Sequence, residues 1–96
     1  MKATLVVDTR TVEPDGAIVQ VRIRLLPAPV PPCTHRYKYS LFYGWPGRRV
    51  VGYDNERGKG DHKHVTGVEA PYAFTSIERL LDDWAADVLR QKGEKP

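Results

Sequence analysis

The sequence contains a single cysteine, Cys33, and no long hydrophobic run. One thiol excludes an intramolecular disulfide and a cysteine-based zinc cluster, and it suits a reducing compartment. No apolar stretch approaches the ~20 residues that a membrane-spanning helix needs. Residues 1–8 become acidic too early for the hydrophobic region of a signal peptide. We therefore expect a cytoplasmic protein that does not enter a membrane.

Common catalytic motifs are missing as well. The sequence has no GxxxxGK[ST] phosphate loop, no HExxH zinc motif and no nucleophile elbow. The segment Gly58-Lys59-Gly60 is too short to cradle phosphates in the manner of such a loop. We therefore expect no cofactor.

The composition is that of one ordinary globular domain with an uneven charge. The 96 residues fit a single domain over 1–96, and 41% hydrophobic with 28% charged residues is a usual balance. The net charge is +3, but residues 36–64 hold seven basic and three acidic side chains, a local charge of +4, and the three histidines lie in or beside this stretch. A local positive field of this kind attracts phosphates.

Alternation of polar and apolar residues predicts strands over 3–13, 17–26, 36–43 and 48–54. Turn residues separate the hairpins, and the proline-rich residues 27–32 form a stiff spacer, because proline cannot donate to a sheet ladder. The third strand carries a row of tyrosines, which is more typical of a core than of a base-stacking platform.

Residues 55–74 are polar and basic, and they predict a loop in which 62–65 could form a short strand. A helix is expected over about 76–92, with Thr75 and Glu78 as a capping box and an apolar stripe centred on Trp84. The outer face of this helix would carry Asp82, Asp83 and Asp87. The predicted fold class is α+β: an antiparallel sheet of about four strands, a meander of hairpins over about 3–54, packed by one C-terminal amphipathic helix.

The chemistry of the chain centres on two histidines. On an extended segment, His62 and His64 would lie on one face, with Lys63 on the other. Two imidazoles can serve as general base and general acid in RNA cleavage, and Asp54 could orient one of them. The same pair with Asp54 or Asp61 could instead hold a divalent ion, or the histidines could simply decorate a basic loop.

The run from Tyr53 to His64, YDNERGKGDHKH, resembles the signature of the TumE-like toxins of toxin–antitoxin pairs. The resemblance extends back through residues 35–39 and the 15–17 hairpin, and forward through 69–74 into the helix. It implies a growth-inhibiting toxin encoded beside a helix-turn-helix antitoxin. It also marks the motif positions Tyr53, Asp54, Asn55, Asp61, His62 and His64 as the site.

We therefore predict a toxin that acts on RNA as a metal-independent endoribonuclease, with His62, His64 and Asp54 as catalytic residues. The predicted substrate-binding residues are Tyr53, Asn55, Asp61, the phosphate-holding Arg57, Lys59 and Lys63, and the outlying Arg48 and Arg49. The alternatives are a non-catalytic binder of nucleic acid or protein, and a divalent-metal-dependent nuclease. An exposed edge strand or the tyrosine row could also pair two copies as a homodimer.

Overall fold

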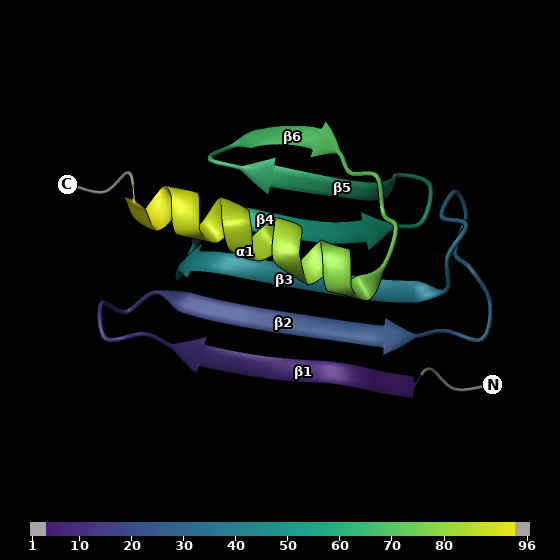
Figure 1. Ribbon diagram of the computed structural model, residues 1–96, viewed down its shortest axis with the longest axis horizontal. Coiled ribbons are helices and arrows are strands. Elements are labelled where there is room, and N and C mark those ends of the chain that lie inside the picture. Colours follow the sequence, from purple (N-terminus) through teal and green to yellow (C-terminus); the bar gives the residue numbers. More distant parts are fainter. Residues whose placement is uncertain (1–3, 94–96) are drawn as a thin grey trace.

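The computed structural model describes residues 4–93 and shows one antiparallel sheet covered by one helix (Figure 1). The six strands follow one another in the sheet in chain order, β1 to β6, and helix α1 comes last. Their bounds are β1 Thr4–Val12, β2 Ile18–Leu25, β3 Tyr37–Trp45, β4 Arg48–Glu56, β5 Gly60–Val65, β6 Val68–Pro71 and α1 Ile77–Gly93. The α+β class and the C-terminal helix are confirmed. Ala3, the predicted first residue of the sheet, lies outside the described residues.

The sheet has six strands, so the prediction of about four strands and a loop over 55–74 is wrong. Residues 60–65 and 68–71 pair as β5 and β6. The tight turns on either side of β5 explain why residues 55–74 are rich in glycine and polar side chains, a composition that had indicated a loop. Gly58 and Gly60 adopt φ of +81° and +80° after β4, and Thr66 and Gly67 adopt φ of +48° and +84° in the two-residue hairpin that follows β5. Glycine and polar residues here build turns and a solvent-facing strand, not a loop.

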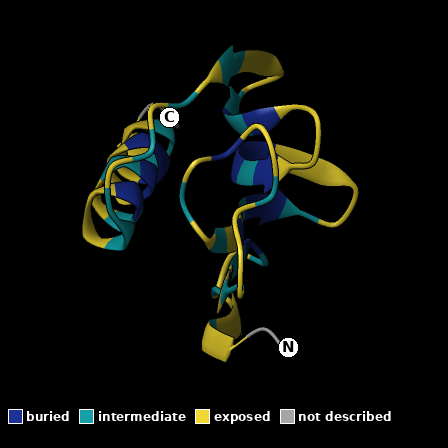
Figure 2. Ribbon diagram, turned by 90° about the vertical axis from the view of Figure 1, so that its right-hand side faces the viewer, coloured by how far each residue is buried: buried dark blue, intermediate teal, exposed yellow. Residues whose placement is uncertain are grey.

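Helix α1 lies over β3 and β4 on one side of the sheet, as two views at right angles show (Figures 1 and 2). Figure 2 also shows that the helix and the central strands bury the sides that face each other. The tyrosine row belongs to this core, as predicted, because Tyr39 and Tyr43 are 1% and 0% exposed. The rings of Tyr39 and Tyr43 are therefore closed to stacking bases, whereas Tyr37 is partly buried at the edge of the core. The buried core consists of Ala17, Ile23, Tyr39, Leu41, Tyr43, Val50, Val51, Tyr53, Leu80, Trp84 and Val88.

The helix differs from its prediction at two places. The Ser76 hydroxyl accepts the Arg79 N–H at 3.0 Å, so Ser76 is the N-cap in place of Thr75. Asp87, expected on the outer face, is 5% exposed and points into the protein. Leu80, Trp84 and Val88 pack against the sheet as the apolar stripe predicts.

The other side of the sheet, called here the open face, has no helix over it within residues 4–93. The register places Arg22 opposite Ser40, Ser40 opposite Asp54, and Asp54 opposite His62, so these side chains form one row across four strands on that face. Among the described residues, no helix is long and apolar enough to cross a bilayer. The open face thus presents a row of polar side chains that a polar ligand can reach.

Candidate functional site

Asp54, His62 and His64 meet on the open face because of strand alternation. Asp54 on β4 pairs with His62 on β5, and Gly52 pairs with His64. Directly opposed residues of an antiparallel pair point to the same face, and so do residues two apart on one strand. The prediction that His62 and His64 share a face, with Lys63 on the other, is confirmed. Glu69 on β6, opposite His64, completes what we call the histidine cluster: Asp54, His62, His64 and Glu69.

The side chains of the histidine cluster are in contact. His62 is 3% exposed, its Nδ1–H donates to the Gly60 carbonyl at 3.0 Å, and its Nε2 contacts the Asp54 carboxylate. The two imidazole rings lie edge to face with their centroids 5.3 Å apart. The Glu69 Oε2 lies 3.1 Å from the Nε2 of His64 and 3.8 Å from the Nε2 of His62. Two imidazoles and two carboxylates from three strands therefore converge at one point.

Basic side chains border the cluster. The pKa of His64 is lowered by burial and by the charge of Arg49. Lys59 forms an ion pair with Glu69, and this hydrogen bond raises the pKa of Lys59 and lowers that of Glu69. The Arg49 side chain covers Gly52, where a Cβ atom would collide with it. Lys59 and Arg49 are thus the predicted cations that lie at the site.

Two other predicted phosphate-binding residues lie outside the cluster. Arg57 is exposed between β4 and β5, and the guanidinium of Arg48 sits 5.9 Å from the centre of the Trp45 ring. Neither contacts the histidines in the part of the chain described.

Four predicted site residues lie on the side of the sheet that faces the helix, so they are not part of the cluster. Tyr53 is buried and donates its hydroxyl to Asp87, and Lys63 forms an ion pair with Asp87 at 3.3 Å. Asn55 is buried and ties β4 to β3 by accepting the Tyr39 N–H at 3.1 Å. Asp61 accepts hydrogen bonds from His35 and Tyr39. Alternation along Tyr53-Asp54-Asn55 and Asp61-His62-Lys63 sends neighbours of the site residues to the opposite face.

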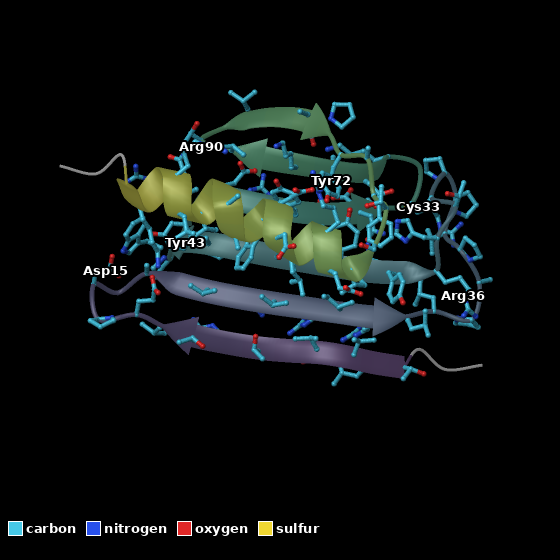
Figure 3. All side chains as sticks on the ribbon, viewed as in Figure 1. Asp15, Cys33, Arg36, Tyr43, Tyr72 and Arg90 are labelled. Atoms are coloured by element: carbon cyan, nitrogen blue, oxygen red, sulfur yellow. The ribbon has the colours of Figure 1, made fainter. Side chains whose placement is uncertain are left out.

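Cys33, His35 and Asp61 form a second cluster, called here the cysteine cluster, on the helix side; these residues were not grouped in the sequence-based prediction. Cys33 lies at the end of the sheet where β4 turns into β5, at the other end from Tyr43 and Asp15 (Figure 3). The His35 Nε2 is 2.8 Å from Asp61, and its ring stacks on Phe74 with centroids 3.8 Å apart. The one sequence signal for this cluster is its place at the end of the proline spacer (residues 27–32), where the chain returns to the sheet.

A basic pocket also lies on the open face, beside the histidine cluster. It has a volume of about 200 Å³ and is lined by Arg22, Arg24, Lys38 and Ser40, with part of Tyr39. The residue row described above links it to Asp54 and His62. Arg22 and Arg24 flank the buried Ile23 on β2, so alternation places both on the open face; neither was among the predicted site residues.

The fold and the cluster define a small α+β protein with a polar, histidine-centred site on an exposed sheet face. The family model described as Toxin TumE matches residues 2–92, nearly the whole chain. The chain therefore belongs to the TumE family and is a toxin of a toxin–antitoxin system, which confirms the resemblance. Comparison with curated proteins found no match, and comparison with solved structures found none either.

Proposed function

We propose that this toxin arrests growth in the cytoplasm by cutting RNA at the histidine cluster, and that a helix-turn-helix antitoxin restrains it. The observation that carries the proposal is the convergence of His62, His64 and Asp54 on an open sheet face next to a basic pocket. Buried histidines paired with carboxylates at a surface are a recurrent sign of a chemical site.

RNA suits this face because RNA carries both negatively charged phosphates and a reactive 2′-hydroxyl. Arg22, Arg24 and Lys38 can take a phosphate in the basic pocket. Neighbouring strands are about 4.8 Å apart, so Arg22 and His62, three strand steps apart, are separated by about 14 Å across the sheet. A strand of RNA lying across β2 to β5 would therefore reach the pocket with one phosphate and the histidine cluster with another.

The proposed reaction is transfer of the phosphodiester to the ribose 2′-oxygen. The 2′-hydroxyl gives its proton to a base and its oxygen bonds to phosphorus, while the bond to the 5′-oxygen breaks and that oxygen takes a proton from an acid. The products are a 2′,3′-cyclic phosphate and a 5′-hydroxyl. The imidazole pair can supply base and acid without metal, as predicted from the sequence, with Lys59 and Arg49 stabilising charge on the phosphate.

A second candidate chemistry uses the same side chains as ligands of a cation. A specific observation favours it: the buried Asp54 Oδ1 and His62 Nε2 have no hydrogen-bond partner within residues 4–93, although they touch each other. A divalent-metal-dependent nuclease therefore stands beside the metal-free one, and EDTA separates the two.

The test compares His64→Ala with His35→Ala in growth arrest and in cleavage of labelled RNA. His64 is partly exposed, with 17% of its side chain accessible, so its loss should leave the fold intact. His62 is 3% exposed within β5, so its replacement would disturb the fold as well, and the test therefore changes His64 alone. We expect loss of both activities in His64→Ala and retention in His35→Ala, whose ring lies in the cysteine cluster.

Retained toxicity in a folded His64→Ala variant would contradict the proposal. RNA binding without cleavage by the unaltered protein would favour the non-catalytic binder instead. The basic pocket has its own test, because Arg24→Glu should weaken RNA binding and reduce its salt dependence by about one phosphate contact. A homodimer through an edge strand stays open to sedimentation analysis, since β6 exposes 67% of Val68.

A further inference from the structure

The hydrogen bond between His62 and Gly60 determines where His62 carries its proton. A backbone carbonyl can only accept, so the Nδ1 atom that lies 3.0 Å from the Gly60 oxygen must bear hydrogen. In a neutral imidazole the Nε2 atom is then a bare acceptor. That atom is in contact with the Asp54 Oδ1, a second acceptor.

Two buried acceptors in contact repel each other unless a positive charge lies between them. Both atoms lack a hydrogen-bond partner among residues 4–93, and burial without compensation is costly for polar atoms. Three further carboxylate oxygen contacts add negative potential here, because Glu69 lies 3.8 Å and Glu56 lies 4.0 Å from the His62 Nε2, and Glu69 also lies 3.1 Å from His64. The arrangement calls for a cation.

We propose that Asp54, His62 and His64, with Glu69 as fourth ligand, form a binding site for a divalent first-row transition-metal ion such as Zn²⁺. This inference rests on the proposed function in its metal-dependent form, because imidazoles that bind the ion cannot also act as base and acid; the binding itself can be measured without RNA. The ligand atoms of Asp54, His62 and His64 all lie within 4.8 Å of one another. A tetrahedral ion with ligands at 2.0–2.2 Å separates them by about 3.3–3.6 Å. The 3.1 and 3.8 Å spacings that involve Glu69 are close to these values, whereas His62 and Asp54 are closer together and must move apart to admit the ion.

The donor set points to the class of metal. Imidazole nitrogens suit zinc, iron, nickel and copper, whereas magnesium and calcium prefer oxygen ligands alone. The hydrogen bond from the His62 Nδ1–H to a backbone carbonyl is the usual outer support of a metal-bound imidazole, since it directs the Nε2 lone pair at the ion. Asp61, the other carboxylate considered from the sequence, is excluded because it lies on the helix side and binds His35 and Tyr39.

The cysteine cluster has a similar donor set but the opposite proton arrangement. The His35 Nδ1 accepts the Tyr37 N–H at 3.1 Å, so in the neutral ring the proton sits on Nε2 and is donated to Asp61 at 2.8 Å. Asp61 also accepts the Tyr39 hydroxyl at 2.7 Å. No ring lone pair of His35 is left for a metal. The cysteine cluster is therefore an internal control: it also joins a histidine to an aspartate, but in the opposite tautomer and with Cys33 in place of a second histidine.

The experiment titrates the full-length chain, first stripped with a chelator, with Zn²⁺, Mn²⁺ and Mg²⁺ in separate calorimetric runs, and follows the thermal midpoint. We expect one Zn²⁺ per chain, a raised midpoint and much weaker binding of Mg²⁺. His64→Ala should weaken Zn²⁺ binding by more than about 100-fold, because loss of a ligand exceeds the 10–100-fold effect of an outer partner. Glu69→Gln should weaken it as well. His35→Ala and Cys33→Ser should bind as the unaltered chain does.

The proposal is overturned if the unaltered chain binds no Zn²⁺, which would mean that a proton alone neutralises the His62–Asp54 contact. It is also overturned if His35→Ala abolishes binding while a folded His64→Ala variant retains it. Failure of the proposed function has a different outcome: one Zn²⁺ bound with no RNA cleaved keeps the metal site and removes the nuclease. Cleavage that persists in EDTA, by a chain that binds no Zn²⁺, keeps the nuclease and removes the metal site.

Discussion

Replacing Asp87 with alanine tests whether a buried carboxylate joins the helix to the sheet. Asp87 is 5% exposed on α1, and it accepts the Tyr53 hydroxyl from β4, the Arg90 guanidinium at 2.6 Å and the Lys63 ammonium at 3.3 Å. Asp87→Ala leaves the Tyr53 hydroxyl without its acceptor and Lys63 without its counter-ion. Because both losses fall at the interface of the two layers, the effect should appear as global destabilisation.

The size of the effect follows from the partners. A buried donor left unpaired costs about 1–3 kcal/mol, and breaking a buried ion pair costs about 3–5 kcal/mol. Since Arg90 and Lys63 are partly exposed and can turn to water, we expect about 3 kcal/mol in total. For a domain of this size that loss lowers the thermal midpoint by about 12–24 °C.

Urea unfolding followed by tryptophan fluorescence measures this loss, because Trp84 on α1 packs into the core. Asp82→Ala is the matched control: the same residue type on the exposed side of the same helix, where a change should stay within about 0.5 kcal/mol. Asp87→Asn keeps an acceptor for Tyr53 and should fall between the two. Equal stability of Asp87→Ala and Asp82→Ala would refute the reasoning.

The pH dependence provides a second check. Burial alone would raise the pKa of Asp87, but the hydrogen bonds from Tyr53 and Arg90 and the charge of Lys63 outweigh it, so the pKa lies below its ordinary value of 3.8. A carboxyl with a lowered folded pKa stabilises the protein above its unfolded pKa, and this contribution is lost as the pH falls through the folded value. The stability difference between the unaltered chain and Asp87→Asn should therefore be constant at neutral pH and shrink below pH 3.8.

Three further predictions concern the cap, the turns and the thiol. In urea unfolding, Ser76→Ala should cost about 1 kcal/mol of stability and Thr75→Ala less than half of this. The reverse order would mean that Thr75 is the N-cap, as the sequence predicted. Gly44→Ala should cost about 3 kcal/mol, because its Cβ would meet the backbone oxygen of Arg48. Gly47→Ala, with φ of +74° and open space around it, should cost only about 1 kcal/mol, and equal losses would contradict this account. Burial and the neighbouring Asp61 raise the pKa of the Cys33 thiol, so at pH 8 it should react with a disulfide reagent far more slowly in the folded than in the urea-unfolded chain; equal rates would contradict its burial.

The strands β1 to β4 and helix α1 could be predicted because their apolar residues repeat with the period of their structure. Strand β6 could not, and of β5 only residues 62–65 were foreseen as a possible short strand. Their buried side depends on single residues such as His62, which counts as polar in any sequence pattern but is 3% exposed. Composition therefore indicated a loop where pairing with β4 makes a strand.

The sequence predicted a histidine pair beside Asp54, but it did not predict which other residues lie with them. Spacing alone brought His62 and His64 to one face, and their contact with Asp54 agrees with it. Tyr53 and Asn55 were included as motif positions of the family resemblance. They adjoin Asp54 in the chain, so alternation sends them to the opposite side of the sheet. Asp87 was assigned to solvent because a carboxylate is rarely buried, and its partner Tyr53, 34 residues away, cannot be foreseen from the helix pattern.

The chain-order meander has a consequence for how the toxin is made. Each strand pairs with the one before it, so the sheet needs only short loop closures, which favour rapid folding. The histidine cluster and the basic pocket are complete once residue 71 has joined the sheet, whereas the aromatic side waits for the last element, α1. During synthesis, the surface that would meet RNA thus takes shape before the core is sealed.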